Sequence, residues 1–202
     1  NQSLQLGACI GRGSMGRVHV NAQDPTQAIK VIPLGKVKDE IDPELVKLAT
    51  WELQAHEMAG NECEQVVKFH RAQVANGCLY LVLERLEGVS LKWKVAGQLG
   101  AFALSELPGV GRQILVALKY LHGRGVIHGD IKPANLFLTH GGIIKLLDFG
   151  GSGPNNPIYT PAYAPRDWRV KDARFDLYSL GVTLCELVSG QIHRDKAILS
   201  ET

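Results

Sequence analysis

The sequence predicts an α+β fold in two lobes: a small antiparallel β-sheet lobe with one helix, followed by a helical lobe. Short segments that alternate apolar and polar residues, separated by glycine and turn residues, fill the first part of the chain. After it, apolar residues recur mainly at helical spacing in two long segments. Charged residues and a glycine at 84–88 interrupt the pattern. We therefore expect domains at residues 1–86 and 87–202.

The first lobe is expected to contain five strands and one helix. The helix is placed at Pro43–Ala59, because proline is favoured in a first helical turn and the apolar residues that follow share one face. The expected strands are Leu4–Ala8, Val18–Val20, Ala28–Ile32, Val66–Phe69 and Leu79–Leu83.

The second lobe is expected to contain two long helices with two short strands between them. Ser105 suits the N-cap of a helix that ends at about His122, since a serine hydroxyl can accept a hydrogen bond from a free amide of the first turn. Short strands at Leu136–Leu138 and Ile143–Leu147 flank a glycine turn. The last helix is expected from about Phe175 to Val188.

Composition argues against several classes of protein. The net charge is +2 and the basic residues are dispersed, whereas nucleic-acid-binding domains usually carry a basic patch. No apolar run approaches the ~20 residues of a membrane helix. The four cysteines form no C-x-x-C pair, which argues against a zinc site. We expect a monomer that binds neither nucleic acid nor membranes.

A glycine-rich segment at residues 11–18 reads Gly-Arg-Gly-Ser-Met-Gly-Arg-Val and matches G-x-G-x-x-G-x-V. Glycines allow the backbone to approach phosphate oxygens and present N–H groups to them. Dinucleotide-binding folds share this spacing, but there a helix follows the glycines. Here a strand is expected after Gly16, which favours a phosphate-binding hairpin.

Lys30 lies on the next expected strand, in Ala28-Ile29-Lys30. A lysine on an apolar strand is costly to bury unless it meets an anion, so a phosphate is a suitable partner. A carboxylate from the following helix should hold the ammonium in place. Glu52 is the preferred candidate, because it shares a face with Leu45 and Ala49, and Glu57 is the alternative.

The most specific segment is residues 128–135, His-Gly-Asp-Ile-Lys-Pro-Ala-Asn. Asp130 can accept the proton of an attacking hydroxyl, Lys132 can neutralise a transferring phosphoryl group, and Asn135 can bind a metal ion. Asp148 follows after two short strands, in Asp-Phe-Gly, and can supply a second metal ligand. Mg2+ prefers oxygen ligands of this kind.

In this order and at these spacings the motifs resemble those of a eukaryotic-type protein kinase, from Gly11 to Gly181. The resemblance implies ATP and Mg2+ as cofactors, with Asn135 and Asp148 as metal ligands and Lys30, Glu52, Asp130 and Lys132 as catalytic residues. It implies an activation segment from Asp148 to Pro165, a gatekeeper at Leu83 and a supporting role beneath the catalytic loop for Asp176. The implied nucleotide-binding residues are Gly11, Arg12, Gly13, Ser14, Gly16, Val18, Ala28, Lys30, Leu83, Glu84, Leu86, Asn135 and Asp148.

Three features depart from the family pattern. Gly129 replaces the arginine before the catalytic aspartate, Arg166 replaces the glutamate of the Ala-Pro-Glu motif, and the sequence stops soon after the last expected helix. These features resemble the minimal kinases that bacteria secrete through type III systems as effectors, which act on the host ninety-kilodalton heat-shock chaperone. The resemblance implies a shortened second lobe and a location in the host cytoplasm. Otherwise we expect a cytoplasmic protein.

Two other functions compete with a protein kinase. Small-molecule kinases of the aminoglycoside or choline type also have the sequence His-Gly-Asp in their catalytic loop. Lys132-Pro133 and the 160–165 segment, however, are typical of protein kinases. A pseudokinase that serves as a binding module usually lacks a catalytic residue, whereas Lys30, Asp130 and Asp148 are all present. Lys132 and Thr160 favour serine and threonine as acceptors. Because Gly129 cannot pair with a phosphate, we expect activity without phosphorylation of the activation segment.

Overall fold

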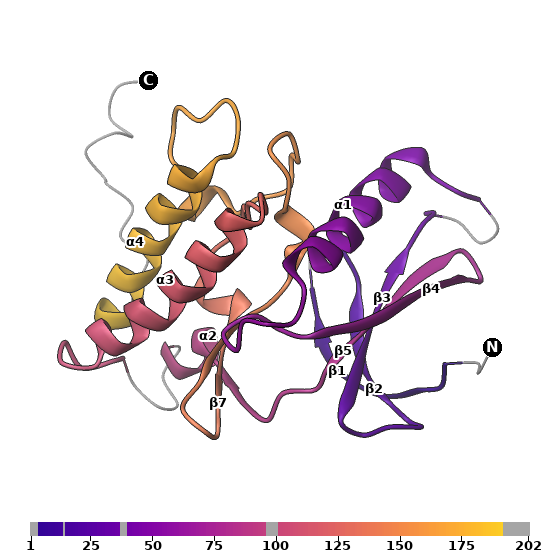
Figure 1. Ribbon diagram of the computed structural model, residues 1–202, viewed down its shortest axis with the longest axis horizontal. Helices are drawn as coiled ribbons and strands as arrows, with labels where there is room; N and C mark the ends of the chain where they lie inside the picture. Colours follow the sequence, from indigo (N-terminus) through magenta and orange to yellow (C-terminus); the bar gives the residue numbers. More distant parts are fainter. Residues whose placement is uncertain (1–3, 14, 37–39, 96–100, 192–202) are drawn as a thin grey trace.

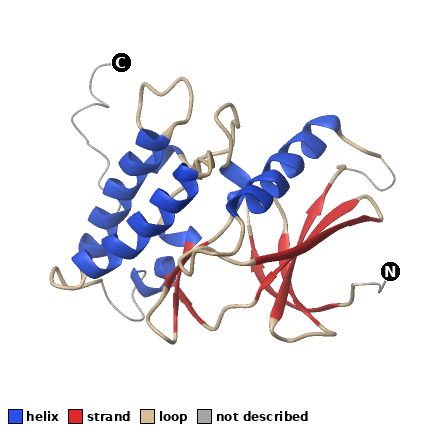
Figure 2. Ribbon diagram, viewed as in Figure 1, coloured by secondary structure: helices blue, strands red, loops and turns tan. Residues whose placement is uncertain are grey.

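The computed structural model describes residues 4–13, 15–36, 40–95 and 101–191. The first part of the chain forms a strand-rich lobe covered by one helix, and the second part forms a mainly helical lobe (Figure 1). Figure 2 shows the same separation by type, with most strands in one lobe and two long helices side by side in the other. The predicted α+β fold with an antiparallel first lobe is confirmed. The domain division at residue 86 falls between two strands and stays a prediction.

The first lobe is built on a five-stranded sheet in which all neighbouring strands are antiparallel. The strand order is β1-β2-β3-β5-β4, so β3 lies in the middle with β5 beside it. This central position buries residues on both faces of β3, among them Ile29 and Ile32. The strands are β1 (Leu6–Arg12), β2 (Arg17–Asn21), β3 (Gln27–Pro33), β4 (Phe69–Ala75) and β5 (Cys78–Glu84).

Helix α1 (Pro43–Ala59) covers this lobe, as predicted. The side chain of Asp42 caps it by accepting a hydrogen bond from the amide of Glu44, and Pro43 occupies the first turn, where no intrahelical amide bond is lost. Ala49 packs with Ile32 and Leu81 of the sheet in one hydrophobic cluster. This packing fixes which face of α1 meets the sheet.

The second lobe contains a small sheet, β6-β7-β8, and two long helices. Apolar residues of α3 at Val110, Ile114, Leu118 and Leu121 form a buried stripe at helical spacing. They pack into a larger core that also includes residues of β7, β8 and α4. The elements are β6 (Gly88–Ser90), α2 (Leu91–Trp93), α3 (Leu107–Gly123), β7 (Leu136–Thr139), β8 (Ile144–Leu146) and α4 (Ala173–Ser189).

Several boundaries differ from the prediction. The strand expected at Val66–Phe69 is wrong, because Val66 and Val67 are buried against Leu146 of β8, whereas β4 begins only at Phe69. Strand β4 lies at the edge of the sheet and carries polar residues, so its sequence gives little apolar signal.

The cap of the first long helix was also mispredicted. Helix α3 begins at Leu107, with Glu106 rather than Ser105 at the N-cap. The Glu106 carboxylate instead accepts a hydrogen bond from the amide of Ala103 at 2.7 Å, which closes the turn before the helix. The first strand runs to Arg12, further than the predicted end at Ala8, and β6 was missed because it is only three residues long.

Within the described residues, no helix has both the length and the apolar character that crossing a membrane requires.

Candidate active site

A cavity of about 370 Å³ lies where the sheet of the first lobe faces the loop residues of the second. Its walls come from β1, β2, β3, α1, β5 and the segment that contains β7. It brings together most of the residues predicted to bind nucleotide, although they are spread over nearly 140 positions of the chain. The predicted residues in its lining are Gly11, Arg12, Gly13, Val18, Ala28, Lys30, Glu52, Leu83, Glu84, Leu86, Lys132, Asn135 and Asp148.

The glycines of the glycine-rich loop have different structural roles. A Cβ added to Gly13 would lie 3.2 Å from Asp148 Oδ2 and 3.8 Å from Lys30 Nζ, so this glycine keeps the loop close above the charged groups. Gly16 does not line the cavity: a Cβ there would lie 2.0 Å from the carbonyl oxygen of Val31, so it is needed where β2 meets β3. This differs from its predicted nucleotide contact. Ser14 lies outside the described residues.

Lys30 is almost fully buried and contacts two carboxylates. Its Nζ lies 2.5 Å from Glu52 Oε1 and 2.7 Å from Asp148 Oδ1. Burial opposes the ammonium, but the two carboxylates outweigh it and raise the pKa of Lys30. The helix partner of Lys30 is therefore Glu52, and Glu57 is exposed on α1.

Asp148 adopts a left-handed backbone conformation, with φ 61°. Such a conformation is uncommon for a residue with a side chain and is typical of functional sites. Although burial works in the other direction, the Lys30 ammonium and the Gly150 amide lower the pKa of Asp148 to about 2. Asp148 therefore carries a negative charge at neutral pH.

Phe149 is fully buried and holds the backbone of Asp148 in this orientation. Its ring lies between His56 of α1, at a centroid distance of 4.7 Å, and His128 of the catalytic loop, at 5.3 Å. His56 also stacks on Phe69 of β4 at 5.5 Å, so the stack joins the two lobes. Burial lowers the pKa of His56 to about 3, which keeps this ring neutral within the stack.

Two polar side chains of the catalytic loop, residues 128–135, contact Asp130. Lys132 Nζ donates to Asp130 Oδ2 at 2.6 Å and to the hydroxyl of Thr160 at 2.6 Å. Asn135 Nδ2 donates to the main-chain oxygen of Asp130 at 2.8 Å and to Oδ2 at 3.2 Å. Asp130 Oδ1 is buried without a hydrogen-bond partner in the described part of the chain, so it is free to accept one from a substrate.

Asp176 of α4 supports this loop from below, as the resemblance implies. Its carboxylate is fully buried and accepts hydrogen bonds from the main-chain amides of His128 at 2.9 Å and Gly129 at 2.8 Å. A third contact joins it to His122 Nε2 at 2.8 Å. Two buried amides and an imidazole satisfy the carboxylate, which fixes the loop to the helix.

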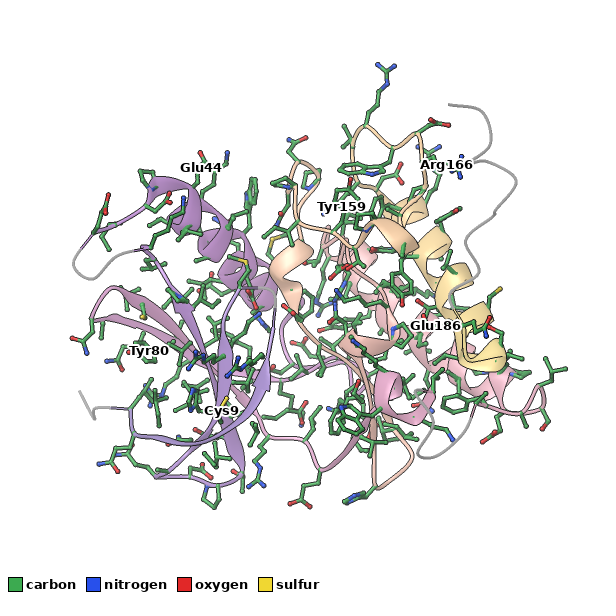
Figure 3. The ribbon with its side chains drawn as sticks, turned by 180° about the vertical axis from the view of Figure 1, so that it is seen from behind. Cys9, Glu44, Tyr80, Tyr159, Arg166 and Glu186 are labelled. Atoms are coloured by element: carbon green, nitrogen blue, oxygen red, sulfur yellow. The ribbon has the colours of Figure 1, made fainter. Side chains whose placement is uncertain are left out.

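The far end of the activation segment is tied to α4 without a glutamate at position 166. The hydroxyl of Tyr163 donates to Glu186 at 2.5 Å, and the hydroxyl of Ser179 donates to the carbonyl oxygen of Tyr163 at 2.9 Å. Arg166 is exposed and makes no ion pair with any described residue. Figure 3 shows it at the outer edge of this lobe.

The donor groups fit magnesium and a nucleotide phosphate. Asp148 supplies an ionised carboxylate, and the amide nitrogen of Asn135 is turned toward Asp130, so its oxygen remains as a ligand. Both oxygens are of the type that Mg2+ prefers. At the other end of the cavity the amide of Glu84 already donates to Lys68, so a ligand there would meet the Glu84 carbonyl oxygen.

Sequence reasoning missed several lining residues. His56, Val67, Phe137 and Leu147 line the cavity but carry no motif of their own. Their positions close to motif residues are a usable signal: Phe137 lies on β7 two positions after Asn135, and Leu147 directly precedes Asp148. His56 lies four residues after Glu52, which places it on the same face of α1.

Comparison with known proteins agrees with this geometry. The sequence matches the protein kinase domain family over residues 4–198. It is 32% identical over 220 residues to serine/threonine-protein kinase ppk11 of Schizosaccharomyces pombe, covering 98% of this chain and 66% of that protein.

Two other relatives are much longer than this chain. A relative named "Probable serine/threonine-protein kinase PknB", of Bifidobacterium longum, is 30% identical over 213 residues, covering 93% of this chain and 30% of that protein. Serine/threonine-protein kinase STE20 of Debaryomyces hansenii is 32% identical over 199 residues, covering 90% and 17%. The chain thus spans less than two thirds of each of these relatives. With the match over residues 4–198 and the motif residues gathered around one cavity, the chain belongs to the protein kinase domain family.

Proposed function

We propose that the protein is a serine/threonine protein kinase, which transfers the γ-phosphoryl group of ATP to a hydroxyl group of a protein. The observation that carries this proposal is the convergence of Lys30, Glu52, Asn135 and Asp148 on one cavity, with the Lys30–Glu52 ion pair formed. Asp130 lies beside this cavity and accepts a hydrogen bond from Asn135. The cavity has the volume of a small-molecule site.

Each of these residues has a separate role in the transfer reaction. The oxygen of the substrate hydroxyl forms a bond to the γ-phosphorus, the bond to the bridging oxygen of ADP breaks, and Asp130 takes the hydroxyl proton. Lys132, 2.6 Å from Asp130, can neutralise charge on the transferring group, and Lys30 can orient the other phosphates. Asn135 and Asp148 would hold Mg2+, which would neutralise the negative charge that develops on the phosphates.

The contact between Lys132 and Thr160 supports a serine or threonine acceptor. Lys132 Nζ joins the hydroxyl of Thr160 to the carboxylate of Asp130, so the end of the activation segment is bound beside the catalytic carboxylate.

The test is a transfer assay with labelled ATP and Mg2+, run separately with protein substrates, with aminoglycosides and with choline. Phosphoserine or phosphothreonine in the protein substrate, lost in Asp130→Asn, is the expected result. Phosphorylation of a small molecule alone would favour the small-molecule kinase, and nucleotide binding without any transfer would favour a binding module. Folding of the variant is checked by its melting temperature.

We further propose that the kinase is a secreted bacterial effector that acts in the host cytoplasm on the ninety-kilodalton heat-shock chaperone. The support comes from two motif positions: Gly129 stands where the family usually has arginine, and Arg166 stands where it usually has glutamate. Incubation of the protein and MgATP with the purified eukaryotic chaperone should add phosphate to a serine or threonine. An unmodified chaperone, beside an active kinase on another protein, would remove this part of the proposal.

A further inference from the structure

Lys171, directly before α4, is a buried lysine that no motif explains. It is 1% exposed. Two other lysines are buried in the described part of the chain, and both pair with carboxylates: Lys30 with Glu52, and Lys145 with Glu84 at 2.6 Å. Lys171 has no carboxylate partner within hydrogen-bond distance among the described residues. A buried ammonium requires other compensation, so its surroundings are informative.

The ammonium of Lys171 is bound by carbonyl oxygens of the activation segment. Its Nζ donates to Gly151 O at 2.8 Å and to Ile158 O at 2.5 Å, and its main-chain amide donates to Pro154 O at 3.0 Å. Gly151 lies near the start of the segment and Ile158 lies beyond its middle. One side chain therefore connects two parts of the segment that are seven positions apart.

Three aromatic rings surround the same ammonium. Its Nζ lies 5.7 Å from the ring centroid of Tyr159, 5.8 Å from that of Trp168 and 5.6 Å from that of Phe175. The rings also pack edge to face on one another, with Trp168 4.9 Å from Tyr159 and 5.3 Å from Phe175. Figure 3 shows Tyr159 on the inner side of the segment. Ring faces attract cations, and a closed cage excludes water from the carbonyl contacts.

Lys171 also fills the space beside Gly129, which stands before the catalytic aspartate. Gly129 has φ 75°, and a Cβ added to it would lie 3.0 Å from both Cδ and Nζ of Lys171 and 2.3 Å from Gly151 O. Gly151 in turn packs on Asp130, since a Cβ added to Gly151 would lie 3.0 Å from Asp130 Cβ. The ammonium therefore acts on the catalytic loop through Gly151.

Two uncharged side chains add further tethers in the same part of the segment. Asn156 is fully buried, and its Nδ2 donates to Gly150 O at 2.9 Å and to Ser152 O at 2.8 Å. The hydroxyl of Ser152 donates to His128 O at 3.2 Å. These contacts, with those of Lys171, hold the segment in one shape and require no phosphate group.

We propose that Lys171 is a positioning residue, whose ammonium ties both parts of the activation segment to the base of the catalytic loop and sets its active shape without phosphorylation. The inference rests on the proposed kinase function. Lys171 does not line the nucleotide cavity, so its loss should affect the rate of transfer and leave nucleotide binding nearly unchanged. A merely structural lysine would instead affect stability alone, with a normal rate for each folded molecule.

The test compares Lys171→Met with Lys119→Met, which removes an exposed lysine of α3. Lys171→Met should lower kcat at least tenfold with the KM for ATP within twofold of wild type, and Lys119→Met should change neither. Hydrogen exchange should become fast at residues 151–158 in Lys171→Met while α3 and α4 stay protected. A wild-type kcat, or an unchanged exchange rate at 151–158, would overturn the proposal.

A second measurement uses the wild-type protein, in case Lys171→Met does not fold. In NMR spectra of the unphosphorylated protein, the ε-methylene protons of Lys171 should be shifted upfield by the three rings, and residues 151–158 should exchange slowly. An unshifted signal or an unprotected segment would contradict the proposal. This measurement needs no catalysis, so it still tests Lys171 if the wild-type protein transfers no phosphoryl group, a result that would count against the proposed function instead.

Discussion

Replacing Lys30 by methionine should destabilise the protein as well as inactivate it. The substitution removes the ammonium that contacts Glu52, whose side chain is 0% exposed, and Asp148, whose side chain is 20% exposed. Breaking a buried ion pair by removing one partner typically costs about 3–5 kcal/mol, because a charge is left uncompensated. For a chain of this size, each kcal/mol lowers the melting temperature by about 2–4 °C. We therefore expect a fall of about 10 °C near neutral pH.

The pH dependence makes this prediction specific. In the wild type the pKa of Asp148 is about 2, below the ordinary aspartate value of 3.8, so its contribution to stability is present above pH 3.8 and is lost as the pH falls through 2. In Lys30→Met that contribution is gone, and the buried carboxylates are stabilised by protonation. The difference in unfolding free energy between the two proteins should therefore stay constant near neutral pH and shrink as the pH falls through 3.8 toward 2.

Urea unfolding at several pH values, followed by circular dichroism, measures these free energies. The double variant Lys30→Met/Glu52→Gln is the matched control, because it removes the uncompensated carboxylate and should recover at least half of the lost stability. A deficit that stays the same across the pH range, or a double variant no more stable than the single one, would refute the reasoning that links Lys30 to its two carboxylates.

Three further substitutions test the surroundings of the site. Asp176→Asn should lower kcat and reduce the free energy of unfolding by about 2 kcal/mol in urea titrations, because a buried charged acceptor of two amides is lost. Gly129→Ala should lower the free energy of unfolding by at least about 2 kcal/mol in the same assay, because φ 75° is unfavourable for alanine and its Cβ would meet Gly151 O. A urea midpoint equal to that of the wild type would show that the loop adapts freely. Arg166→Ala should stay within about 0.5 kcal/mol of wild type in thermal melts, and a loss of ten degrees would show that this exposed residue anchors the segment.

The elements that position the site could be predicted where local pattern and motif agreed. Helix α1 was placed with its correct bounds because Pro43 and the apolar stripe mark the same element. The contact between Lys30 and Glu52 followed from the spacing of one helix face. Val66 misled the prediction, since its apolar character reflects burial against the second lobe and not pairing within the first sheet.

The arrangement of the activation segment could not be predicted, because its tethers join residues that are distant in sequence. Lys171 stands in a polar stretch before α4, where a lysine is normally solvated, and its burial depends on three rings brought together by the fold. The role of Gly16 was misassigned for a related reason: the motif gives the glycine, but only the register between β2 and β3 shows what it approaches.

The most direct test of the central claim is a time course of transfer by protein that carries no phosphate. The protein is treated with a phosphatase, its unmodified state is checked by intact mass, and it is then mixed with MgATP and a protein substrate. We predict that phosphoserine or phosphothreonine forms at a constant rate from the first time point, and that Asp130→Asn abolishes it. No transfer to protein, or a lag that ends only when the segment from Asp148 to Pro165 becomes phosphorylated, would contradict the account.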